Sequence, residues 1–265
     1  MLSHKPGDIE KVVSAAAGNN HLLVLTTHGN VFTWGAGEQG QLGRKIIDRR
    51  KIHGTVPEKI ALGHRSNRAT VVGAGNYCSF AVDEAGDVWG WGLNTMGQTG
   101  TGVSEPRSMS DEIHTPRKVE KLCKSVLGEE VVVQIAGGEH HTLFLTSAGR
   151  VFACGRCDDG QLGLPEDHAE YKSRPNPDCV SEPLEVPFGV DGDPIVAIAS
   201  GTHNNMAITR AGVLYAWGEE SQGELGVKEA EAKTPTVVVR KEGSFEAVGV
   251  ACGGQHTLGL FKKKA

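Results

Sequence analysis

The sequence lacks the features that mark membrane and secreted proteins. No apolar run approaches the length of a membrane span. The amino end has no apolar signal-peptide core, because Asp8 and Glu10 follow soon after Met1. Six cysteines are spread thinly over 265 residues, a distribution typical of reduced thiols and not of a disulfide framework. We therefore expect a soluble, intracellular protein.

Motifs for common catalytic chemistry are also missing. We find no P-loop, nucleophile elbow or paired-carboxylate arrangement. Cys154 and Cys157 form a lone CxxC, but zinc needs two further ligands at suitable spacing, and a redox motif wants a helix after it. The net charge of −5 argues against nucleic-acid binding across the whole surface. The sequence predicts no catalytic residue, metal, cofactor, small-molecule substrate or membrane partner.

Glycine, in contrast, is abundant at 36 residues, and much of it belongs to an internal repeat. A first block, Gly-x-x-His or a variant followed by apolar residues, begins at Gly18, Gly75, Gly138, Gly201 and Gly253. A second block, close to Gly-x-Val-Phe-x-Trp-Gly and then Gly-Gln-Leu-Gly, begins at Gly29, Gly86, Gly149 and Gly212. Length varies between the second block and the next first block, where insertions fit loops on one face of a repeat array.

Each repeat unit has the pattern of short β-strands. Leu22–Leu25 and Val31–Trp34 are predicted strands joined by a tight turn, where glycine supplies positive φ. An apolar strand such as Ile9–Ala15 precedes them, and a proline-containing outer strand or loop follows. About four strands per unit predict an all-β β-propeller. We expect one domain over 1–265, with units at about 9–70, 71–130, 131–193 and 194–244 and a half-unit at 245–261.

The run from Gly35 to Gly40 matches the GxGxxG dinucleotide-binding pattern. That fingerprint requires a helix after the glycines and an acidic residue about 20 positions on, inside a βαβ unit. The sister units keep the β pattern and lose the glycine spacing, since Leu93 and Asn94 take the places of Ala36 and Gly37. We therefore interpret the glycines as turns of a β unit.

Together the two blocks resemble the repeat of the regulator of chromosome condensation family, from about Val12 to Leu260. The resemblance implies a propeller that is seven-bladed in the family. It also implies guanine-nucleotide exchange on the Ran GTPase, in the nucleus and on chromatin, without covalent chemistry. Long inserts and the run Gly37–Arg44 favour the exchange factor within this family. The alternative is a non-catalytic propeller scaffold for protein–protein interaction, because other members use the same repeat for other partners.

Four units and a half-unit are fewer than the seven that close a ring in the family. By resemblance we expect a carboxy-terminal portion of a longer exchange factor, without the first blades and the family's β-wedge. Ile9–Ala15 and Phe245–Leu260 would then present unpaired edges, which favour association.

Residues that recur from unit to unit are expected to be structural. They are three histidines and three tryptophans: His21, His141, His256, Trp34, Trp91 and Trp217. Each histidine can hydrogen bond to a backbone group of its own blade. The tryptophans are expected to pack between blades, and Cys154 takes the tryptophan place in the third unit as a buried apolar residue.

The place before the recurring histidine varies, and its residues are Asn20, Tyr77, His140, His203 and Gln255. Loops at one end of a rigid scaffold are where partner contacts gather. By resemblance these positions lie on the GTPase-binding face, where His140 matches a histidine important for exchange and Arg44 matches an arginine. Asn20 stands where the family often has aspartate, so an acidic contact does not carry over there.

Arg44–Lys51 is a basic cluster. It is either a solvated loop or, by resemblance, a loop that docks arginines on the acidic patch of histones, where bidentate pairing of arginine with carboxylate supplies specificity. Arg49 and Arg50 are the candidate chromatin-binding residues.

Overall fold

The computed structural model describes residues 9–46, 52–102, 112–189, 192–219, 221–227, 232–238 and 244–264. These residues form antiparallel sheets that follow one another along the chain. The first sheet has the order β1 (Val12–Ala17), β2 (His21–Thr26), β3 (Val31–Gly35), β4 (Glu58–Lys59). The second has the order β5 (Ala69–Ala74), β6 (Cys78–Asp83), β7 (Val88–Leu93), β8 (Glu112–Lys118).

The later sheets repeat this order. The third consists of β9 (Val132–Gly137), β10 (His141–Thr146), β11 (Val151–Arg156) and β12 (Cys179–Glu185). The fourth consists of β13 (Ile195–Ser200), β14 (Asn204–Thr209), β15 (Leu214–Gly218) and β16 (Ala232–Val237). Two strands, β17 (Phe245–Cys252) and β18 (Thr257–Lys263), form the last sheet.

The central hairpin of each four-stranded sheet follows the sequence pattern. In the first sheet Leu22 pairs with Trp34 and Leu25 with Val31. Gly29, with φ of 69°, closes the turn, and its N–H donates to Thr26 O at 2.9 Å. The expected proline-containing strands are also present, since β8, β12 and β16 each contain a proline and each lies at a sheet edge. Proline is tolerated there because an edge strand leaves some N–H groups unused.

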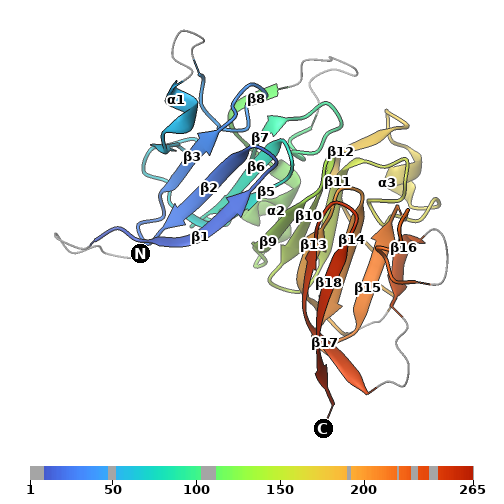
Figure 1. Cartoon of the computed structure of the whole chain (residues 1–265). Coiled ribbons are helices and arrows are strands. Elements are labelled where there is room, and N and C mark those ends of the chain that lie inside the picture. The colour runs from blue at the N-terminus through green and yellow to red at the C-terminus, as the bar shows by residue number, and fades with distance from the viewer. Residues whose placement is uncertain are drawn as a thin grey trace.

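The sheets lie side by side in an arc, with the first and the last sheet at its two ends (Figure 1). The first strands of successive sheets are neighbours in space: β1 beside β5, β5 beside β9, β9 beside β13 and β13 beside β17. This is the radial arrangement of propeller blades, so the expected all-β β-propeller architecture is confirmed. Loops that connect equivalent strands therefore lie at the same end of every blade.

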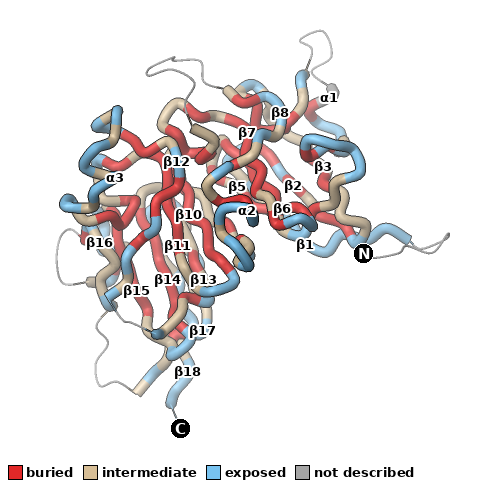
Figure 2. The backbone as a smooth tube through the Cα atoms, turned by 180° about the vertical axis from the view of Figure 1, so that it is seen from behind, coloured by how far each residue is buried: buried red, intermediate tan, exposed pale blue. Residues whose placement is uncertain are grey.

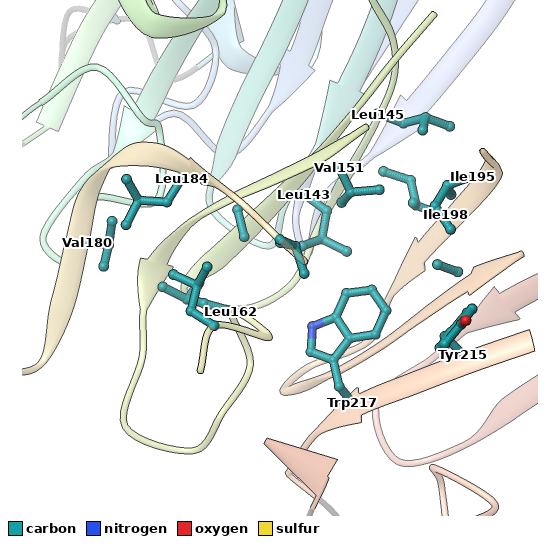
Figure 3. Packing of buried hydrophobic residues seen from close by; sticks show 14 of the residues in the cluster. Leu143, Leu145, Val151, Leu162, Val180, Leu184, Ile195, Ile198, Tyr215 and Trp217 are labelled. Carbon is teal, nitrogen blue, oxygen red and sulfur yellow. The ribbon is translucent and has the colours of Figure 1, made fainter. Parts of the chain in front are cut away.

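The core lies between neighbouring sheets. Figure 3 shows the cluster between the third and fourth sheets, where Leu143 and Val151 face Ile198, Tyr215 and Trp217. Similar clusters lie between the first and second, the second and third, and the fourth and last sheets. Each blade is therefore stabilised mainly by burying apolar area against the next blade.

The outer flanks of the arc are exposed, as the pale blue stretches of β1 and β18 show in Figure 2. Val12 and Val13 in β1 are 61% and 58% exposed, and Leu258 and Leu260 in β18 are 67% and 66% exposed. The residues equivalent to Val12 in β5, β9 and β13 are Ala69, Val132 and Ile195, which are at most 5% exposed because the preceding sheet covers them.

Short helical segments lie in the connections: α1 (Ile52–Thr55), η2 (Glu120–Leu122), α2 (Lys124–Leu127) and α3 (Ala169–Lys172). Among the described residues, no helix has the length and apolar character needed to cross a membrane.

Candidate partner-binding face

The Gly-Gln-x-Gly loops after the third strands join each sheet to the next. Gln98 supplies one such joint, because its carbonyl accepts hydrogen bonds from Thr142 Oγ1 at 2.8 Å and from Cys154 Sγ at 3.7 Å in the following sheet. Gln41 O accepts equivalent bonds from Ser79 Oγ and Trp91 Nε1. The glutamine side chain meanwhile holds its own turn: Gln98 Oε1 accepts the N–H of Met96 at 2.9 Å. This double use explains why the motif recurs.

Two of the recurring histidines also join sheets. His21 Nε2 lies 2.8 Å from Ser79 Oγ, and His141 Nε2 lies 2.8 Å from Asn205 Oδ1, in each case in the next sheet. For these two histidines the expectation of a backbone bond within the same blade was wrong: Cε1 and Nδ1 of each ring lie against the glycine at the start of its block, and Nε2 reaches the neighbouring sheet. His256, in the last sheet, is exposed.

The burial of the residue at the tryptophan position also depends on which sheet carries it. Trp91 and Trp217 are fully buried, and each packs on the second glycine of the preceding loop, Gly43 or Gly163. Cys154 occupies this place in the third sheet, where it is fully buried against Gly100. Burial raises the pKa of the Cys154 thiol, as expected of a group inside an apolar contact. Trp34, in the first sheet, is half-buried.

At one end of the blades, the loops between first and second strands of neighbouring sheets are linked by main-chain hydrogen bonds. Asn19 N–H donates to Asn76 O at 2.9 Å, Asn76 N–H to Gly138 O at 3.0 Å, and Glu139 N–H to Thr202 O at 3.1 Å. These loops carry the variable positions Asn20, Tyr77, His140 and His203, and the equivalent loop of the last sheet carries Gln255. Asn20 and Gln255 are exposed and the other three are half-buried, so the expected positions form one accessible face.

A second layer of loops supports this face. The carbonyl groups of Asn20, Tyr77, His140 and His203 each accept the N–H of the residue that follows the third strand's last glycine, at 2.7–3.2 Å. Gly155 shows why that residue is glycine: its φ is 112°, and a Cβ there would lie 2.3 Å from His140 O. The backbone at His140 is therefore held from both sides, which pre-positions its side chain.

His140 lies in a polar cluster with partners from two sheets. Its Nδ1 lies 3.4 Å from Gln98 Nε2, and its Nε2 lies 3.9 Å from Glu139 Oε1. Burial lowers the pKa of His140, the carboxylate of Glu139 raises it, and Arg156 lowers it again. His140 is thus favoured as a neutral imidazole with one donor and one acceptor nitrogen.

His203 lies next to His140 and contacts two carboxylates. Its Nε2 is 3.1 Å from Glu139 Oε2, and its Nδ1 is 2.5 Å from Glu219 Oε2. Arg156 completes the cluster by donating from Nε and Nη2 to the carboxylate of Asp158. Glu139, Arg156 and Glu219 are not among the residues that the sequence predicted for this face. An alignment of the units at the residue after the last glycine of the third strand would have found Arg156 and Glu219, because they share that place with Ala36 and Leu93.

The fold agrees with three comparisons. A family model described as the RCC1-like domain matches residues 2–259. The chain belongs to the RCC1-like family. Protein pim1 of Schizosaccharomyces pombe is 37% identical over 257 residues, 94% of this chain and 45% of that protein. Guanine nucleotide exchange factor SRM1 of Saccharomyces cerevisiae is 31% identical over 93% of this chain and 50% of its own length.

The fold is similar to that of a solved RCC1-family structure. Prp20p from Saccharomyces cerevisiae, whose structure is described together with its binding to Gsp1p and histones, matches with a TM-score of 0.84 at 27% identity. The match covers 100% of this chain and 58% of Prp20p. The resemblance to the regulator of chromosome condensation family is thereby confirmed, and the chain spans about half the length of the relatives that it matches.

Arg44 does not join His140 at this face. Its side chain is only 13% exposed, and Nη2 donates to Thr33 O and Val56 O while Nη1 lies 3.3 Å from Glu58 Oε2. The guanidinium therefore ties the loop after β3 to β3 and β4, and we propose a structural role for it in place of the predicted contact. Arg49 and Arg50 lie outside the described residues.

Proposed function

We propose that this chain contributes the nucleotide-exchange face of a guanine-nucleotide exchange factor for the Ran GTPase. The linked loops that carry Tyr77, His140 and His203 support this proposal most directly, because they offer a rigid, accessible row of polar groups at one end of the blades. The names of two relatives agree with it: one is called a guanine nucleotide exchange factor, and the other is described as binding Gsp1p and histones. Asn20 and Gln255 extend the same row at its ends.

Exchange of this kind needs no covalent step. The face would bind the nucleotide-free GTPase more tightly than the nucleotide-bound form, and by linkage it would weaken nucleotide binding by the same factor. His140 and His203 would supply hydrogen bonds to the GTPase that compete with those holding the phosphates. Because their loops are held by main-chain bonds, little ordering is required on the propeller side.

The test is the release of fluorescent GDP from Ran in the presence of the folded chain. We expect His140→Ala to lower the stimulated rate by about 10-fold or more, the size expected when one buried polar contact of about 1.4 kcal/mol is lost. His64→Ala is the matched control, because this exposed histidine follows β4 and hydrogen bonds locally to Ser66. A folded chain that neither accelerates release nor binds nucleotide-free Ran would overturn the proposal in favour of a scaffold for another partner.

We further propose that the chain acts in the nucleus on chromatin, with Arg49 and Arg50 as the histone contact. The support is the basic character of Arg44–Lys51 and the histone binding stated for Prp20p. Pull-down with reconstituted nucleosomes would test it, with Arg49→Ala and Arg50→Ala combined in one variant. Equal recovery of wild type and this variant would refute the role of the two arginines, and Lys262→Ala serves as a control for lost positive charge.

A further inference from the structure

A histidine on this face lies between carboxylates from two sheets. His203 follows β13, Glu139 precedes β10 and Glu219 follows β15. Nε2 of the imidazole is 3.1 Å from Glu139 Oε2, and Nδ1 is 2.5 Å from Glu219 Oε2. Both ring nitrogens therefore face a carboxylate oxygen at hydrogen-bonding distance.

This arrangement favours positive charge at the imidazole. A neutral imidazole carries one N–H, so only one of its nitrogens can donate to a carboxylate. If Nε2–H donates to Glu139, the lone pair of Nδ1 points at the oxygen of Glu219. At this distance the two atoms share a second proton, whereas binding of a tetrahedral Zn²⁺ ion would move them apart to about 3.3 Å.

A third potential ligand lies at the same place. One ligand atom each from Asp159, His203 and Glu219 lies within 4.8 Å of the other two, close enough to share one metal ion. Asp159 is held by its backbone, because its N–H donates to Gln161 Oε1 at 2.8 Å. Burial raises the pKa of the Asp159 carboxyl, and the adjacent carboxylate of Asp158 raises it further, as expected where negative charge is crowded.

The charges around the imidazole do not balance. Arg156 donates to both carboxylate oxygens of Asp158 and reaches Asp159 only at 3.8 Å. Once Arg156 and Asp158 are paired, the carboxylates of Asp159, Glu139 and Glu219 remain around one histidine. The group thus attracts a divalent cation.

We propose that His203 Nδ1, Asp159 and Glu219 form a binding site for a divalent transition-metal ion of the zinc class. Glu139 accepts the hydrogen bond from Nε2–H and so orients the imidazole, which is the usual outer-shell partner of a metal-bound histidine. One nitrogen and two oxygen ligands match Zn²⁺, whereas Mg²⁺ and Ca²⁺ prefer oxygen alone. This site departs from the sequence-based expectation of no metal, because its ligands come from three separate loops.

The surroundings leave room for the ion to enter and for a further ligand. A hollow of about 460 Å³ adjoins the site, lined by Thr202, His203 and Glu219 among others. The side chains of His203 and Glu219 are 28% and 43% exposed. Three protein ligands would leave the fourth position of a tetrahedral ion to water or to a group of a bound partner. The inference concerns the isolated chain and does not rest on the proposed exchange activity.

Calorimetric titration of the chelator-treated chain with Zn²⁺ tests the site, with Mg²⁺ as the comparison ion. We expect one equivalent of Zn²⁺ to bind, Mg²⁺ to bind at least about 10-fold more weakly, and Zn²⁺ to raise the midpoint of thermal unfolding. Both His203→Gln and Asp159→Asn should weaken Zn²⁺ binding at least about 10-fold, and Glu139→Gln about 10- to 100-fold through loss of the orienting bond.

His114→Gln is the matched control. It also removes a histidine that lies beside a carboxylate, because His114 Nε2 is 3.5 Å from Glu112 in β8, but this histidine is outside the proposed site. This variant should bind Zn²⁺ as the wild type does. Absence of Zn²⁺ binding by the wild type would mean that a proton occupies the contact, and it would overturn the proposal. Binding that is unchanged in both His203→Gln and Asp159→Asn would also overturn it, since the ion would then lie elsewhere.

Discussion

The two buried histidines between blades should make this protein sensitive to mild acid. His21 and His141 are 3% and 1% exposed, and burial lowers the pKa of each to about 4 from the ordinary 6.5. Because the folded-state pKa is lower, the unfolded chain binds more protons between pH 6.5 and pH 4. Stability must therefore fall as the pH falls through this window, and it is fully retained above it.

The size of the effect follows from the two pKa values. At pH 5 each histidine is largely protonated in the unfolded chain and largely neutral in the folded one, which costs about 2 kcal/mol per group. Together they should lower the free energy of unfolding by about 4 kcal/mol between pH 8 and pH 5, a large share of the stability of an ordinary domain. Carboxylates such as Asp158, whose pKa is lowered by its bond to Arg156, lose their contribution only at lower pH.

Urea unfolding at pH 8, 6.5 and 5, followed by tryptophan fluorescence, measures this dependence. The substitution His141→Gln should cost about 1 kcal/mol at pH 8, because an amide replaces the bond to Asn205 imperfectly. It should also remove about half of the loss between pH 8 and pH 5. The double variant with His21→Gln should remove nearly all of it, and the exposed His64→Gln is the control. A double variant with the wild-type pH dependence would refute the reasoning.

Four further substitutions test the joints between sheets and the loop that carries His140. In chemical denaturation, Trp91→Phe should lower the free energy of unfolding by about 1 kcal/mol more than Trp217→Phe. The reason is that Trp91 Nε1 donates to Gln41 O, whereas Trp217 Nε1 is buried without a hydrogen-bond partner among the described residues. Equal losses would contradict this. The substitution Asn205→Ala should cost about 1–3 kcal/mol by the same measurement, since it leaves a buried carbonyl unpaired. The substitution Gly155→Ala should lower the thermal unfolding midpoint and weaken partner binding together, because its φ of 112° and the clash with His140 O force the loop to move; an unchanged midpoint would refute the strain.

The succession of similar blades could be predicted from the sequence. Equivalent glycines and apolar residues recur at equivalent places, and a period-two strand with a glycine turn has one stable arrangement as a hairpin. The strands around Leu22–Leu25 and Val31–Trp34 follow from that pattern alone. The edge position of the proline-containing strands follows from the missing N–H of proline.

The candidate site was predictable only in outline. The variable place in the first block predicted which residues lie on one face, because equivalent loops of a radial repeat lie at one end. For Arg44 the sequence predicted a contact with the partner, whereas the structure turns the guanidinium onto Thr33 O and Glu58 within the same sheet. Sequence position gave the loop but not the rotamer, and the rotamer decides which atoms are accessible.

The sequence by itself therefore determined the architecture: its repeated blocks determine which segments become strands, turns and joints of each blade. Tertiary structure alone decided how residues of different blades combine. His21 bonds to the next blade and not to its own, and Asp159 after the third strand of one blade meets His203 and Glu219 of the next. The physical reason is that hydrophobic periodicity acts within a unit, whereas side-chain contacts between units depend on how closely and at what angle the packed sheets approach.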